Sequence, residues 1–153
     1  MNILFKTIYQ TFVIFSACFF FSITFNIPKR ELIYCGFTGA LGWFIYCVSV
    51  YMFDLSNIIG TFLAAIFLTY ACRILSNVRQ APSTIYLIPG ILPLVPGSHM
   101  YYTMYGILNG DMIYSYNEAV LTAKLAGVIA VGIIIVLSLP YSFFDIKNII
   151  KKK

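Results

Sequence analysis

The residues best suited by type and spacing to binding or proton transfer lie together in one apolar stretch, IYLIPGILPLVPGSHMYY, at positions 85–102. This stretch holds the chain's single histidine, His99, directly after Ser98. Histidine changes its protonation near neutral pH, but it can equally serve as a plain hydrogen-bonding group inside a helical bundle. Ser98, Tyr101 and Tyr102 follow the spacing i, i+3 and i+4, which places their hydroxyls along one face of a helix.

Three prolines and two glycines interrupt the same stretch: Pro89, Gly90, Pro93, Pro96 and Gly97. A proline inside a helix removes a backbone donor and costs about 3 kcal/mol. One proline predicts a kink, whereas three so close together favour a helix that stops and restarts. Irregular backbone at membrane depth is tolerated only where it is buried in protein or lines a watery cavity. We therefore expect a broken helix along a substrate path, with a kinked packing helix as the alternative.

The predicted restart of the helix has its own chemistry. Pro96 suits the first turn of a new helix, so the amides of Gly97, Ser98 and His99 are expected to be free. They would stand at the positive end of a helix dipole, which favours anions. A substrate that carries a carboxylate is therefore expected at this point.

Lys124 is a further candidate because it lies inside another apolar run, five residues after Ala119. An ionisable residue within a membrane span is a functional candidate by default. At this shallow depth its long side chain can also reach the outer interface, and both interpretations stay open. Glu118 and Asp111, near the same end of the run, are expected to be solvated.

Composition places all of these residues in a membrane protein. Of 153 residues, 61% are hydrophobic and 10% are charged, against about 45–50% and about 25% in soluble domains. The net charge of +5 does not predict a nucleic-acid partner, because the basic residues stand in short clusters between apolar runs. The four cysteines lack metal-ligand or redox spacing, so we expect them to pack, with no metal and no cofactor. Established catalytic motifs are also missing, which argues against an enzyme.

Five apolar runs are long enough for the roughly 20 residues that a membrane-spanning helix needs. They cover about 7–26, 32–53, 57–75, 84–107 and 119–140. The sequence thus predicts an all-α polytopic membrane protein, with one transmembrane domain over residues 1–153 and five transmembrane helices, the fourth of them broken. The first run is longer than the apolar part of a signal peptide, so we expect it to be retained.

Positive charge predicts how these helices are oriented. The connections after the first and third spans and the C-terminal tail together carry eight Lys and Arg residues, whereas the opposite side offers only Lys6. The N-terminus is therefore expected outside and the C-terminus in the cytoplasm. Five spans can pair with a related unit of five only if that unit is inverted in the membrane. We expect half of an inverted-repeat transporter, with the other half on a second chain.

An Arg-x-x-Pro element at 79–82, followed by IPGILPLVPGSHMYY in a five-span chain, resembles the small subunit of the threonine/serine exporter family. The specific part is PLVPG at 93–97 with Ser98 and Tyr101. The resemblance implies a secondary transporter of the bacterial inner membrane that exports threonine, serine or a dicarboxylate such as succinate. It also implies a partner, either a larger five-span subunit or a second copy of this chain. The alternative is a channel-forming or accessory membrane subunit without coupled transport of its own.

Overall fold

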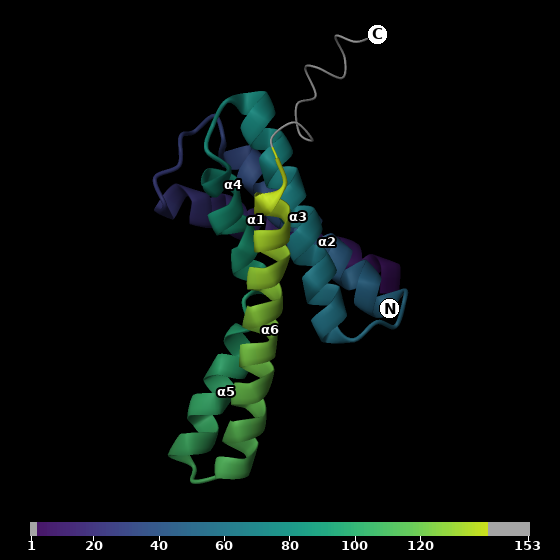
Figure 1. The fold of residues 1–153 in the computed structure, drawn as a ribbon, viewed down its shortest axis with the longest axis vertical. Coiled ribbons are helices and arrows are strands. Elements are labelled where there is room, and N and C mark those ends of the chain that lie inside the picture. The colour runs from purple at the N-terminus through teal and green to yellow at the C-terminus, as the bar shows by residue number, and fades with distance from the viewer. Residues whose placement is uncertain (1–2, 141–153) are drawn as a thin grey trace.

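The structure is a computed structural model that describes residues 3–140, and this part of the chain is helical without strands. The basic residues Lys147 and Lys151 to Lys153, which contribute to the predicted cytoplasmic C-terminus, lie outside the described residues. The elements are α1 (Ile3–Thr24), α2 (Leu32–Tyr51), α3 (Asn57–Arg79), α4 (Ser83–Ile91), the 3-10 turn η1 (Leu92–Leu94), α5 (Gly97–Leu108) and α6 (Met112–Ser138) (Figure 1).

The helices form a bundle from which one hairpin projects (Figure 1). Along the bundle α1 packs on α2, α2 on α3, and α3 on α6, while the short α4 lies against α2 and α3. Helix α5 packs along the first half of α6, and this α5–α6 hairpin extends away from the other helices. The break between α4 and α5 therefore lies where the hairpin leaves the bundle.

Small residues allow α2, α3 and α6 to approach one another closely. A Cβ atom added at Gly42 would lie 2.6 Å from Leu68 Cδ1, and one at Gly132 would lie 3.1 Å from the Cβ of Ala65. Backbones that approach this closely are typical of helix packing in membranes. There the hydrophobic effect does not drive helices together, and small residues allow the close van der Waals contact that does. The buried core around them consists of Cys35, Ala64, Ala65, Leu68, Cys72, Tyr86, Leu87, Leu94 and Ile129.

Four helices, α1, α2, α3 and α6, are long and apolar enough to cross a membrane. The remaining predicted span, 84–107, is built from α4, η1 and α5. Helix α5 has 12 residues and is therefore about 18 Å long, which is short of the roughly 30 Å of the hydrocarbon core. No single helix in this region therefore meets the length of a span.

Helix α6 begins at Met112, seven residues before the predicted start of the last span at about 119. The side chain of Asp111 caps the helix by accepting a hydrogen bond from the amide of Tyr114 at 3.0 Å, which satisfies an amide in the first turn. The polar residues up to Glu118 therefore form the first turns of α6 instead of a loop.

Arg73 also differs from its predicted place in the connection after the third span. Helix α3 continues to Arg79, so Arg73 lies within it and is buried. Its Nη1 donates to the carbonyls of Val136, Leu137 and Leu139 at 2.7, 2.9 and 2.8 Å. The last carbonyls of a helix lack partners inside the helix and carry partial negative charge. Arg73 therefore caps the C-terminal end of α6.

Candidate functional site

A small cavity lies at the break between α4 and α5, where these elements meet α2, α3 and α6. Its volume is about 130 Å³, below the roughly 300–1,000 Å³ of pockets for drug-sized ligands, so its size suits a small metabolite. The lining residues come from five elements and the link before α5: Trp43, Tyr46, Asn57, Thr61, Pro93, Leu94, Val95, Pro96, Ser98, His99 and Leu125.

The first turn of α5 borders this cavity. The amide of Gly97 donates to the carbonyl of Val95 at 2.7 Å, which engages one of the three amides that were predicted to be free. Within residues 3–140, the amides of Ser98 and His99 have no hydrogen-bond partner. Two unpartnered donors at the positive end of a 12-residue helix form a site that favours an anion.

Two buried cysteines repair the backbone that the prolines disrupt. Pro89 and Pro93 have no amide hydrogen with which to bond the carbonyls four residues earlier, those of Ile85 and Pro89. The thiol of Cys35 donates to the Ile85 carbonyl at 3.4 Å, and the thiol of Cys18 donates to the Pro89 carbonyl at 3.3 Å. The cysteines predicted only to pack thus supply weak donors to two carbonyls that the sequence left without partners.

Two further carbonyls near the break have partners as well. The Leu92 carbonyl, to which Pro96 has no amide hydrogen to donate, accepts from the amide of Val95 at 3.4 Å. The hydroxyl of Thr38 in α2 lies 3.3 Å from the Tyr86 carbonyl and 2.9 Å from that of Cys35. Side chains of α1 and α2 therefore bond the backbone of α4 just before η1.

The predicted site residues of the break fall into two groups. Pro93, Pro96, Ser98 and His99 line the cavity. Pro89 and Gly90 are instead buried within α4, where a Cβ atom on Gly90 would lie 3.2 Å from the Thr38 hydroxyl. Gly97 has open space around it, with no atom within 4 Å of an added Cβ.

The remaining predicted residues lie away from the cavity lining. Tyr101 and Tyr102 are on α5 with 63% and 43% of their surface exposed, and their rings pack edge to face at 5.5 Å. Lys124 is exposed on α6, although its neighbour Leu125 lines the cavity. The cavity thus gathers the PLVPG residues with Ser98 and His99, and the tyrosines and Lys124 stand outside it.

His99 and Glu118 form the closest charged contact near the cavity. His99 Nδ1 lies 2.7 Å from Glu118 Oε2, and this contact joins the first turn of α5 to the second turn of α6. The expectation that Glu118 is simply solvated is wrong, because α6 begins early and carries Glu118 alongside α5. The side chains of the pair remain 29% and 20% exposed.

Four lining residues on α2 and α3 were missed from the sequence: Trp43, Tyr46, Asn57 and Thr61. The nitrogen Nε1 of Trp43 is buried and has no hydrogen-bond partner in the described part of the chain. A buried donor without a partner is costly. The available signals were that Trp43 is the chain's single tryptophan and that Asn57 is a polar residue at the start of a span.

The sequence matches the family described as "Threonine/Serine exporter, ThrE" over residues 10–139. This range includes the break, the cavity and the His99–Glu118 pair. The chain belongs to the threonine/serine exporter family. Searches of curated proteins and of solved structures gave no match. Family membership and the four long apolar helices together make this exporter-family chain a multi-pass membrane transporter subunit, and the family is one of transporters rather than enzymes.

A larger hollow of about 630 Å³ lies on the surface of this exporter chain between α1 and α2. Phenylalanines dominate its lining, and Thr11 is its one polar residue; the complete lining is Ile8, Thr11, Phe12, Phe15, Phe37, Ala40, Leu41 and Phe44. A carboxylate buried without several donors is unfavourable. The smaller cavity at the break is therefore the candidate site despite its size.

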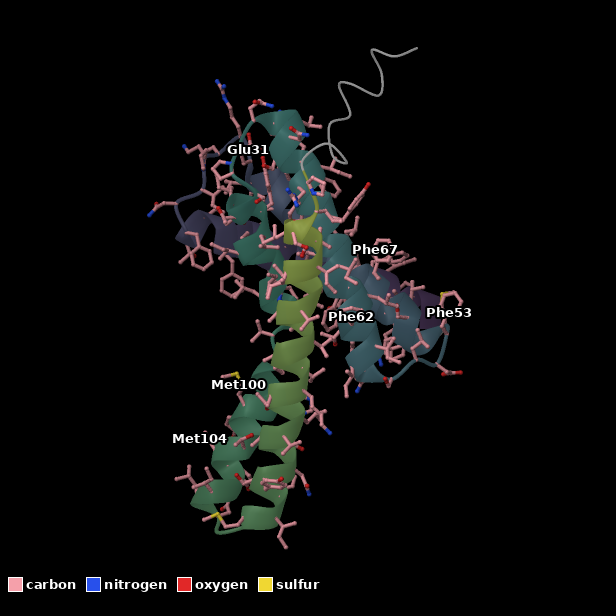
Figure 2. All side chains as sticks on the ribbon, in the orientation of Figure 1. Glu31, Phe53, Phe62, Phe67, Met100 and Met104 are labelled. Atoms are coloured by element: carbon pink, nitrogen blue, oxygen red, sulfur yellow. The ribbon has the colours of Figure 1, made fainter. Side chains whose placement is uncertain are left out.

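A second polar cluster closes the end of the bundle away from the hairpin turn, where Figure 2 labels Glu31. Arg79 donates to Glu31 through Nη2 at 2.8 Å and Nε at 3.1 Å, and the Tyr86 hydroxyl donates to the same carboxylate at 2.7 Å. The hydrogen bonds from Arg79 hold the pKa of Glu31 below its ordinary value of 4.5. This Glu31–Arg79–Tyr86 cluster ties together the start of α2, the end of α3 and α4. The sequence offered no signal for it.

Proposed function

We propose that this chain is one half of a secondary transporter that exports small carboxylate-bearing metabolites across the bacterial inner membrane. The candidate substrates are threonine, serine or a dicarboxylate such as succinate. The observation that carries the proposal is the cavity at the break between α4 and α5, which a helix N-terminus borders with two unpartnered amides. The family of the chain supports the transport of threonine or serine.

The chemistry of the lining supports a carboxylate ligand. The amides of Ser98 and His99 are donors without partners among the described residues, and the α5 dipole adds partial positive charge. The hydroxyls of Ser98 and Thr61 and the amide of Asn57 line the same cavity and can complete the hydrogen bonds of a small polar metabolite. Trp43 adds a large apolar wall, which helps to exclude water and strengthens the electrostatic contacts.

We further propose that α4, η1 and α5 together make a fifth, discontinuous crossing between α3 and α6. A crossing in two pieces is common at the binding sites of secondary transporters. The carbonyls freed in this segment have partners from α1 and α2, which meets the requirement that irregular backbone be satisfied inside the protein. With five crossings, the distribution of Lys and Arg favours an external N-terminus and a cytoplasmic C-terminus.

A second half is expected on another chain, either a larger five-span subunit or an inverted copy of this one. The α5–α6 hairpin stands away from the bundle, and Met100 and Met104 point outward from it with 52% and 58% of their surface exposed (Figure 2). The cavity lies at the base of this hairpin, so a partner seated against the hairpin would enclose the site. Rocking of two halves around a fixed site then exposes the cavity alternately to each side of the membrane.

The proposal is tested by transport in proteoliposomes, with the chain reconstituted alone and together with a candidate second half. Labelled threonine, serine and succinate serve as substrates. We expect saturable, gradient-coupled flux for at least one of them, and loss of that flux in Pro96→Ala or Gly97→Leu. Pro82→Ala is the matched control, because Pro82 lies before α4, outside the cavity.

Normal flux in both Pro96→Ala and Gly97→Leu would overturn the assignment of the cavity as the substrate site. Flux that does not saturate, or that ignores the ion gradient, would favour the alternative of a channel-forming or accessory subunit. Flux by this chain alone would favour a pair of identical halves over a two-component exporter.

A further inference from the structure

The His99–Glu118 pair occupies a position from which it can respond to the state of the cavity. His99 lines the cavity directly, and Glu118 holds the histidine from the neighbouring helix at 2.7 Å. The pair also bridges the α5–α6 hairpin, the part of the fold that leaves the bundle (Figure 1). A change in this contact therefore affects both the binding site and the packing of the hairpin.

The titratable side chains around this pair are mainly tyrosines. Tyr46 of α2 shares the cavity, and Tyr114 of α6 interacts electrostatically with Glu118 and with Asp111. Tyr102 and Tyr105 of α5 lie around Tyr114, and Lys124 of α6 is exposed. Within residues 3–140, neither His99 nor Glu118 forms an ion pair with any other residue. Tyrosine, lysine and aspartate ordinarily titrate far from neutrality, whereas histidine does not.

Opposing effects act on a proton held by His99. The positive end of the α5 dipole disfavours an imidazolium in the first turn, and the carboxylate of Glu118 favours it. The protonated pair carries no net charge, whereas loss of the proton leaves one negative charge on Glu118, in contact with the His99 ring. Because His99 lines the cavity, the occupancy of the cavity and of the proton site are thermodynamically linked.

We propose that the His99–Glu118 pair is the proton-binding site that couples this transporter to the proton gradient, an inference that rests on the proposed export function. In each cycle the imidazole accepts one proton from water on the side to which the site is open. It returns that proton to water on the other side after the site has switched. Glu118 positions the ring and stabilises its protonated form.

The first test needs no transport. Trp43 is the chain's single tryptophan and lines the same cavity as His99, so its fluorescence reports the charge of the imidazole. We expect a sigmoidal change in wild-type fluorescence between about pH 5 and 8, and loss of that change in His99→Gln. In Glu118→Gln the midpoint should move to lower pH, because the carboxylate no longer favours the imidazolium. The same titration in His99→Gln, or an unmoved midpoint in Glu118→Gln, would overturn the assignment.

The second test separates coupling from binding. Proteoliposomes with the assembly that transports are assayed for exchange of labelled threonine at equal pH and for accumulation driven by a pH gradient. We expect Glu118→Gln, whose side chain is not part of the cavity lining, to retain exchange and lose the stimulation by the gradient. His99→Gln should lose the same stimulation, whatever its rate of exchange. Asp111→Asn is the matched control for removal of an acid in the same hairpin, since asparagine also caps a helix, and it should retain both activities.

Gradient-driven accumulation in His99→Gln would contradict the proposal, and so would loss of exchange in Glu118→Gln, because that result assigns the pair to binding or folding. These outcomes are distinct from a failure of the proposed function, in which the wild-type assembly itself shows no protein-dependent flux of any tested carboxylate.

Discussion

The two thiols that bond the proline-freed carbonyls provide a sharp test of how the break is stabilised. In Cys18→Ala the carbonyl of Pro89, a fully buried residue, loses the donor that lies 3.3 Å away. A buried acceptor left without a partner costs about 1–3 kcal/mol. A thiol is a weak donor, so the lower end of this range, about 1 kcal/mol, is expected beyond the loss of packing.

A matched control isolates that contribution. Cys72 is as fully buried as Cys18, and its thiol bonds neither of the two carbonyls, so Cys72→Ala measures the loss of packing together with the loss of its contact with the Thr38 hydroxyl. Cys18→Ser should recover most of the stability, because the hydroxyl is a stronger donor of similar size. The site admits no larger side chain, since the Cys18 sulfur lies tightly against Gly39.

The assay is reversible unfolding in mixed micelles of increasing SDS content, followed by far-UV circular dichroism. Cys18→Ala should be less stable than Cys72→Ala by about 1 kcal/mol, and Cys35→Ala should behave in the same way through the Ile85 carbonyl. If Cys18→Ala costs no more than Cys72→Ala, and serine at position 18 is no better than alanine, the thiols do not stabilise the break.

The remaining predictions concern the packing and the ends of the bundle, each measured by the same unfolding assay. Arg73→Leu should cost at least about 2 kcal/mol, because hydrogen bonds from a charged donor to the carbonyls at the end of α6 are lost; unchanged stability would refute the cap. Gly42→Leu should cost about 1–3 kcal/mol by overpacking against Leu68, 2.6 Å from an added Cβ, whereas Gly127→Leu, with open space around it, should be tolerated. The lowered pKa of Glu31 means that its contribution to stability is present above pH 4.5 and is lost as the pH falls below that value. Glu31→Gln should therefore lack this acid-dependent loss, and an identical pH profile would refute the role of the ion pair.

Much of the fold followed from local features of the sequence. Apolar length fixed the positions of α1, α2 and α3 to within a few residues, because the membrane sets the length of a span. The start of α6 was missed because its first turns hold polar residues up to Glu118, and hydropathy alone cannot distinguish a polar helical turn from a loop. Only the cap at Asp111 reveals the helix.

The sequence predicted the site residues that are close together along the chain, but not those that other helices contribute. Pro93, Pro96 and Ser98 could be predicted as site residues because the effect of proline on the backbone is confined to its neighbours along the chain. Trp43 and Asn57 reach the same cavity from other helices, and their positions depend on how α2 and α3 pack against the break. Nor could spacing predict that Cys18 would meet a carbonyl 71 residues further along the chain.

The central claim, that the cavity at the break binds a carboxylate substrate, is tested most directly by substrate protection of a single introduced thiol. Ser98→Cys places a thiol in the cavity lining, while the four native cysteines are buried. Its modification by a membrane-impermeant thiosulfonate should slow as threonine, serine or succinate is added. Met104→Cys, on the exposed outer face of α5, should react at an unchanged rate. Modification of Ser98→Cys that none of these substrates slows at any concentration would contradict the account.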